Sequence, residues 1–219
     1  MEVASIFDID GTLVTTNFDA QATRRALLAE LSSRGADITG LGMGTPTQGI
    51  LDAARARMGM EDYEDYRKKV FSILDGFELE GMAGSTPFPG AHDVLVELKA
   101  AGVRLGVVTN SGRRSAREAL GRSGLTGIFE FTLTREDTRA MKPSPEGLIE
   151  AVSILSLPPE DVYYVGDSPL DVVAAKGAGV KMVSVTTGNY SAERLRSEGA
   201  DYVIASLSQL VPVLGVQQK

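Results

Sequence analysis

Two aspartates near the N-terminus, Asp8 and Asp10, are the residues of this sequence best placed to do chemistry. They follow an apolar run over residues 3–7 that predicts a buried strand, and Gly11 lets the backbone turn directly after them. Side chains two positions apart on a strand point the same way, so we expect both carboxylates to face one site. Two like charges held close together are costly unless a cation or a shared proton relieves them.

Three later segments bring further polar side chains toward the same place. Thr109 and Asn110 end a second apolar run, and Lys142 lies in a later loop. Asp167 and Asp171 follow another apolar run. In open α/β sheets, ligands bind beyond the carboxyl ends of the strands. We therefore expect acids, a hydroxyl, an amide and an amine to converge at one edge of a sheet.

This set of side chains predicts phosphoryl chemistry assisted by a metal ion. Several carboxylates together need a cation, and ligands that are all oxygen suit Mg²⁺. The sequence has no cysteine and only one histidine, His92, which argues against zinc. A cation, a lysine and an anion cradle formed by Thr109 and Asn110 could stabilise a transferring phosphoryl group. A carboxylate can then act as the nucleophile and form an aspartyl-phosphate.

The pattern beyond residue 88 supplies the elements that must position these residues. Apolar runs that predict strands alternate with segments of helical periodicity. The predicted strands span 103–109, 129–133, 161–165, 181–185 and 202–204, and the predicted helices span 92–101, 112–122, 145–155, 170–178 and 192–198. This alternation predicts an α/β fold, a Rossmann-like parallel sheet covered by helices on both faces.

The segment between the first strand and residue 88 has no strand pattern. It predicts three helices instead, over 18–34, 47–58 and 61–79. We therefore expect an α-helical cap domain inserted after the first strand, over residues 15–87 with hinges at its two ends. The catalytic α/β core would comprise residues 1–14 and 88–219. Within the cap, Arg55 and Arg57 could reach an anionic leaving group, although a surface position is the ordinary alternative.

Composition limits the partners and the location of the protein. The chain has 219 residues, is 43% hydrophobic and carries a net charge of −7, which argues weakly against nucleic acid or an anionic membrane as a partner. No run approaches the roughly 20 apolar residues that span a bilayer. The N-terminal stretch lacks the features of a signal peptide, so we expect a cytoplasmic protein. Both a monomer and a homodimer are compatible with the sequence.

The motifs together resemble the haloacid dehalogenase-like hydrolase superfamily, whose members use an aspartate nucleophile. Residues 8–12 look like its first motif, Thr109-Asn110 its second, Lys142 its third, and residues 166–171 its fourth. The resemblance covers essentially the whole chain. The helical insertion is similar to the cap of the branch that contains phosphoglycolate phosphatases and β-phosphoglucomutases.

This resemblance implies a role for each candidate residue. Asp8 would attack phosphorus, and Asp10 would protonate the leaving oxygen and later deprotonate water. Mg²⁺ would be held by the Asp8 carboxylate, the Asp10 main-chain carbonyl and Asp167, with Asp171 as a further ligand or a close neighbour. Thr109, Asn110 and Lys142 would hold the phosphoryl oxygens of a small phosphorylated metabolite.

Asp10 also separates the possible activities. The dehalogenases of the superfamily lack an acid at this position, so its presence favours a phosphatase. A β-phosphoglucomutase-like enzyme is the alternative, but Ala20 stands where such mutases carry a cap histidine. A phosphoaspartate signalling module is a third possibility, since receiver domains also combine acids with a lysine. Those domains are shorter and have no helical insertion after the first strand.

Overall fold

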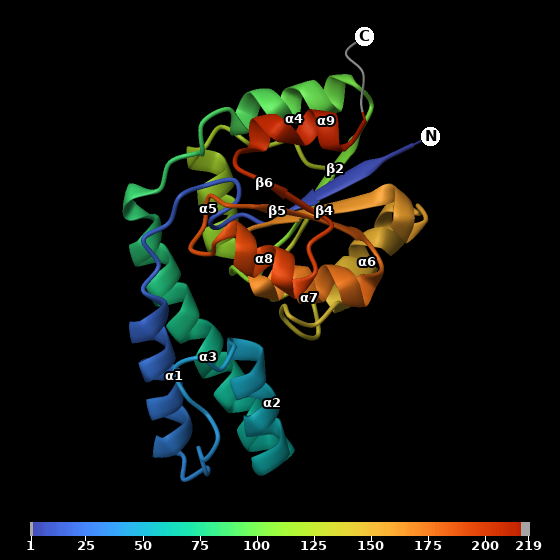
Figure 1. Ribbon diagram of the computed structural model, residues 1–219. Helices are drawn as coiled ribbons and strands as arrows, with labels where there is room; N and C mark the ends of the chain where they lie inside the picture. The colour runs from blue at the N-terminus through green and yellow to red at the C-terminus, as the bar shows by residue number, and fades with distance from the viewer. Residues whose placement is uncertain (1, 216–219) are drawn as a thin grey trace. The chain divides into compact units, whose positions relative to one another are not determined.

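The computed structural model describes residues 2–215, which divide into two compact units. One unit holds the chain up to Thr16 and again from Ser85, and the other is Asn17–Gly84. Figure 1 colours these segments along the chain. The expected boundaries were residues 14 and 88, so the observed division differs from them by a few residues on each side.

A six-stranded parallel sheet forms the centre of the first unit. Its strands are β1 (Ala4–Phe7), β2 (Arg104–Val108), β3 (Phe131–Leu133), β4 (Val162–Gly166), β5 (Lys181–Val185) and β6 (Tyr202–Ile204). They lie in the order β3-β2-β1-β4-β5-β6, and every neighbouring pair is parallel. The structure thus confirms the predicted α/β fold with a parallel sheet.

Helices cover both faces of this sheet. They are α4 (Ala91–Ala100), α5 (Arg113–Arg122), α6 (Glu146–Leu155), α7 (Pro169–Ala178), α8 (Ala192–Glu198) and α9 (Leu210–Val213), with 3₁₀ turns at Pro159–Asp161 and Leu207–Gln209. Figure 1 shows α4 and α9 on one face and α6, α7 and α8 on the other. Buried side chains such as Ile6, Leu148, Tyr164 and Val172 fill the second interface. Burial of this apolar surface is what holds the layers together.

The register of the sheet decides where the polar residues emerge. Phe7 pairs with Val107 of β2 and with Val165 of β4, so these three central strands end at the same level. The order of the strands reverses between β1 and β4, because the chain returns past β1 after β3. Such a reversal is where open α/β sheets bind ligands. The residues that follow β1, β2 and β4 therefore share one edge.

The second unit consists of helices. These are α1 (Ala20–Ser33), α2 (Thr47–Arg57) and α3 (Met60–Gly81), followed by a 3₁₀ turn at Met82–Gly84. Asp19 begins α1, where its side chain accepts a hydrogen bond from the Ala22 amide (2.8 Å). The three helices pack together through a stripe of buried residues on each: Thr23, Leu27, Leu31, Ile50, Leu51, Ala54, Tyr63, Tyr66, Val70 and Leu74.

Tyr66 is the polar anchor of this helical core. Its side chain is fully buried, and its hydroxyl donates a hydrogen bond to the Leu27 carbonyl (3.2 Å). Burial raises the pKa of Tyr66 to about 12, so the hydroxyl keeps its proton. This hydrogen bond links α3 to α1.

Within residues 2–215, no helix is both long and apolar enough to cross a membrane.

Tyr66→Phe should lower the free energy of unfolding of the helical unit by about 1 kcal/mol, because it removes one buried hydrogen bond and leaves the ring in place. Chemical denaturation measures this change. Tyr190→Phe is the matched control, since Tyr190 is 42% exposed; it should change stability by less than about 0.5 kcal/mol. Equal effects of the two substitutions would contradict the role given to the Tyr66 hydroxyl.

Candidate active site

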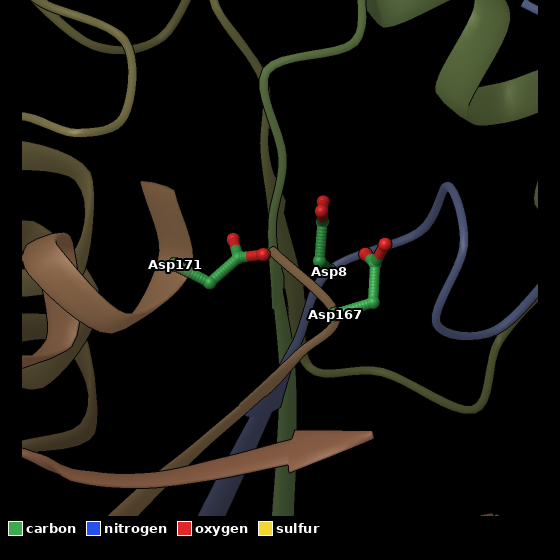
Figure 2. A group of neighbouring side chains, drawn as sticks. All are labelled: Asp8, Asp167 and Asp171. Carbon is green, nitrogen blue, oxygen red and sulfur yellow. The ribbon is translucent and has the colours of Figure 1, made fainter. Parts of the chain in front are cut away.

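Three carboxylates meet at the carboxyl edge of the sheet (Figure 2). Asp8 follows β1, Asp167 follows β4, and Asp171 lies in the first turn of α7. One oxygen of each lies within 4.8 Å of the others. The Asp8 amide donates to the Val165 carbonyl (2.9 Å), so the end of β1 is fixed beside β4. The structure therefore brings together three of the four predicted acids as a single group.

Lys142 supplies the positive charge for this group. Its Nζ lies 3.0 Å from Asp8 Oδ2 and 2.6 Å from Asp171 Oδ1, and it donates a hydrogen bond to the Tyr164 hydroxyl (2.6 Å). Burial alone would lower the pKa of Lys142, but the two carboxylates outweigh burial and raise that pKa above its ordinary value. Lys142 is thus a permanent cation in contact with Asp8.

Asp171 holds Lys142 in place. Its Oδ2 accepts hydrogen bonds from the Ser168 amide (2.9 Å) and hydroxyl (2.7 Å), and the amide bond is part of a capping box between Ser168 and Asp171 at the start of α7. Its Oδ1 accepts from Lys142 and lies 3.0 Å from the Tyr164 hydroxyl. Burial opposes ionisation of Asp171, but Lys142 outweighs it and lowers the pKa of this carboxyl. Both oxygens of Asp171 therefore accept hydrogen bonds, and its place as a metal ligand or a close neighbour of the metal stays a prediction.

Asn110 also acts on Lys142. Its Oδ1 accepts from the Lys142 amide (2.8 Å), and its Nδ2 donates to the Lys142 carbonyl (3.1 Å). These two bonds fix the main chain of Lys142 on both sides of its Cα. The side chain of Asn110 therefore positions Lys142, and its contact with phosphoryl oxygens stays a prediction.

Thr109 and Asp10 meet at Ser111. The Thr109 hydroxyl oxygen accepts a hydrogen bond from the Ser111 amide (3.1 Å), and the Ser111 hydroxyl donates to the Asp10 carboxylate. Thr109 is 4% exposed and Ser111 is 5% exposed, so these contacts are sheltered from water. Ser111 and Tyr164 are site residues that the sequence reasoning did not single out. The position of Ser111, directly after Asn110, was the available signal.

The acids of this site carry more negative charge than Lys142 can balance. Burial is the main cause that raises the pKa of Asp8. Burial, together with the charges of Asp171 and Asp8, raises the pKa of Asp167 from 3.8 to about 8. Among residues 2–215, the buried oxygen Asp8 Oδ1 has no hydrogen-bond partner. A crowded set of oxygen ligands with one unsatisfied buried oxygen fits a divalent cation of the Mg²⁺ type.

Arg57 is committed inside the helical unit. Its guanidinium donates to the carbonyls of Asp37 and of Thr39 (3.1 Å for the latter). These bonds tie α2 to the loop that precedes it. Arg57 therefore supports this loop.

Comparisons with known proteins agree with this geometry. The haloacid dehalogenase-like hydrolase family matches residues 5–185. A phosphoglycolate phosphatase from Haemophilus influenzae is 31% identical over 216 residues, which cover 95% of this chain and 96% of that protein. The pyrophosphatase PpaX from Anoxybacillus flavithermus is 27% identical over 228 residues, with 98% and 97% of the two chains covered.

Solved structures show the same fold. The crystal structure of a hydrolase from Pseudomonas syringae has a TM-score of 0.69 at 22% identity and covers 98% of each chain. Since the family match spans most of the chain and the relatives align over nearly their whole length, the chain belongs to the haloacid dehalogenase-like hydrolase family, as an enzyme of its phosphatase class.

Proposed function

We propose that this phosphatase is Mg²⁺-dependent and hydrolyses a small phosphomonoester through a phosphoryl group carried on Asp8. The environment of Asp8 carries the proposal: one carboxylate oxygen is 3.0 Å from Lys142 Nζ, and the other is buried without a hydrogen-bond partner in the described chain. A buried carboxylate next to a fixed cation is well placed to attack an anionic phosphoryl group. The relatives named phosphoglycolate phosphatase and pyrophosphatase support a small phosphorylated substrate.

Asp8, Asp167 and the main-chain carbonyl of Asp10 would hold the metal ion. When bound, Mg²⁺ supplies positive charge that polarises the phosphoryl oxygens and offsets the surrounding carboxylates. Asp171 is not needed as a ligand in this arrangement, because Lys142 and Ser168 already engage both of its oxygens. We assign Asp171 and Asn110 to the positioning of Lys142.

In the first step, a carboxylate oxygen of Asp8 attacks phosphorus and the bond from phosphorus to the leaving oxygen breaks. Asp10 gives its proton to that oxygen, so an alcohol leaves. Lys142 would offset the negative charge on the phosphoryl oxygens, and the Thr109 hydroxyl would donate a hydrogen bond to one of them. The product of this step is an acyl phosphate on Asp8.

In the second step, Asp10 acts as a base. It takes a proton from water, the water oxygen attacks phosphorus, and the bond between phosphorus and the Asp8 oxygen breaks. Inorganic phosphate leaves and the Asp8 carboxylate is regenerated. The hydrogen bond from Ser111 holds the Asp10 carboxylate while it changes roles.

The proposal also covers the role of the helical unit and the choice of leaving group. We propose that Asn17–Gly84 acts as the cap that selects the leaving group, as its insertion after the first strand suggests. A β-phosphoglucomutase-like reaction is the competing activity. Ala20, the first residue of α1, has no side-chain group that could transfer a proton for a mutase.

A panel of phosphorylated metabolites with Mg²⁺ should identify at least one substrate that releases inorganic phosphate over many turnovers. The panel should include phosphoglycolate, sugar phosphates, nucleotides and pyrophosphate. Asp8→Asn should lower kcat by at least about a thousandfold, since it removes the nucleophile. Near-parental turnover by folded Asp8→Asn would contradict the mechanism, and an isomerised sugar phosphate would instead establish the mutase.

Asp167→Asn and Asp171→Asn should separate metal binding from lysine positioning. Asp167→Asn should weaken Mg²⁺ binding by at least about a hundredfold, whereas Asp171→Asn should change it by less than about fivefold and lower kcat instead. Isothermal titration calorimetry without substrate measures the binding. If the two variants lost Mg²⁺ affinity equally, Asp171 would be a ligand of the metal as well.

Mg²⁺ binding should strengthen as pH rises toward 8. The cation competes with the proton on Asp167, whose pKa is raised to about 8, so each pH unit below that value should weaken binding by up to about tenfold. Without metal, the raised pKa of Asp167 stabilises the fold at low pH, and this contribution is lost as pH rises from about 4 to 8. Thermal unfolding of the parent and of Asp167→Asn, with and without Mg²⁺, tests both statements. An Mg²⁺ affinity that is constant over this range would contradict them.

A further inference from the structure

The loop that follows β5, residues 186–189, contacts the N-terminal motif at two points. The Thr187 hydroxyl donates a 2.6 Å hydrogen bond to the Gly11 carbonyl, across 176 positions of the chain. Gly188 lies directly against the Asp167 carboxylate, because a Cβ added to this glycine would be 1.8 Å from Asp167 Oδ2. We name this segment the 186–189 loop.

Asp167 is enclosed by backbone on two sides. A Cβ on Gly11 would lie 2.5 Å from Asp167 Oδ2, and one on Gly188 would lie 1.8 Å from the same atom. The Thr12 hydroxyl donates to Asp167 Oδ1 (3.2 Å). The carboxylate therefore fills a slot between two glycines, and a hydrogen bond fixes its other oxygen. Real Cβ atoms do not approach other heavy atoms this closely, so the slot exists only while both residues lack a side chain.

We propose that Gly188 and Thr187 are positioning residues for the metal site. Gly188 leaves the space that the Asp167 carboxylate occupies in the group with Asp8. Thr187 holds the Gly11 carbonyl and so fixes the turn that carries Asp10. This inference rests on the proposed function, in which Asp167 and the Asp10 carbonyl are ligands of Mg²⁺.

Gly188 allows a cleaner test than Gly11. The φ of Gly11 is +77°, which strains any residue with a side chain, whereas Gly188 is not among the glycines with positive φ. Alanine at position 188 therefore adds one methyl group without the penalty of a left-handed φ. Asp167 is only 8% exposed, so its carboxylate cannot move freely into water and must shift within the site.

Gly188→Ala should weaken Mg²⁺ binding by at least about tenfold, as loss of support around a metal ligand typically does. Isothermal titration calorimetry with Mg²⁺ alone, without substrate, measures the affinity, and circular dichroism verifies the fold. Gly121→Ala is the matched control in the same unit, since its Cβ would lie 3.9 Å from the nearest atom, Thr126 Oγ1. It should leave the affinity within about twofold of the parent.

Thr187→Val should weaken Mg²⁺ binding by about three- to tenfold, and Thr187→Ser, which keeps the hydroxyl, should restore most of it. A general loss of stability would not distinguish Ser from Val in this way. If Gly188→Ala does not fold, the Thr187 pair decides the question: equal affinities of Thr187→Val and the parent would overturn the inference.

Asp167→Asn separates this inference from the function on which it rests. If Asp167→Asn binds Mg²⁺ with the affinity of the parent, both the proposed metal site and the inference that rests on it are wrong. A large loss in Asp167→Asn together with parental affinity in folded Gly188→Ala would overturn only the role of the 186–189 loop. Losses in both variants, with Gly121→Ala unchanged, would support it.

Discussion

The site depends on the ion pairs that the buried ammonium group of Lys142 forms with Asp8 and Asp171. It lies 3.0 Å from Asp8 and 2.6 Å from Asp171, in a region where burial makes each unpaired charge costly. Asn110 holds its main chain and Asp171 holds its ammonium group. Residues from three segments that are far apart in the sequence therefore contact Lys142. Lys142 does not balance all of the nearby acids, which supports the proposed binding of Mg²⁺ beside Asp8 and Asp167.

The parallel sheet makes this arrangement possible. Its central strands end at one level, so the residues after β1, β2 and β4 are delivered to a common edge whatever their separation in sequence. The glycines in the loops then allow a close approach to the Asp167 carboxylate. The Asp167 carboxylate fits between Gly11 and Gly188 because neither has a Cβ. A rigid scaffold with closely packed loops can hold acids together that would otherwise repel one another.

Much of this architecture could be predicted from the sequence. Alternating apolar runs and helical periodicity define the α/β fold, and the strand ends predict that Asp8 and Asp167 lie together. The partners of the side chains could not be predicted in the same way. Asn110 is predicted to hold phosphoryl oxygens, but the sequence does not reveal that its side-chain amide also binds the main chain of Lys142. The periodicity of apolar residues indicates which side chains are buried, but it does not indicate contacts between loops. The position of Gly188 against Asp167 could therefore not be predicted from the sequence.

In the proposed mechanism, the Asp8 carboxylate carries the phosphoryl group between the two steps. Acid quenching during steady-state turnover with Mg²⁺ and a substrate, followed by peptide mass spectrometry, tests it directly. We predict the mass of one phosphoryl group on the peptide that contains Asp8 during turnover, and its loss when the substrate is exhausted before quenching. A phosphoryl group on any other residue, or an unmodified Asp8 peptide throughout rapid-quench turnover, would contradict the account.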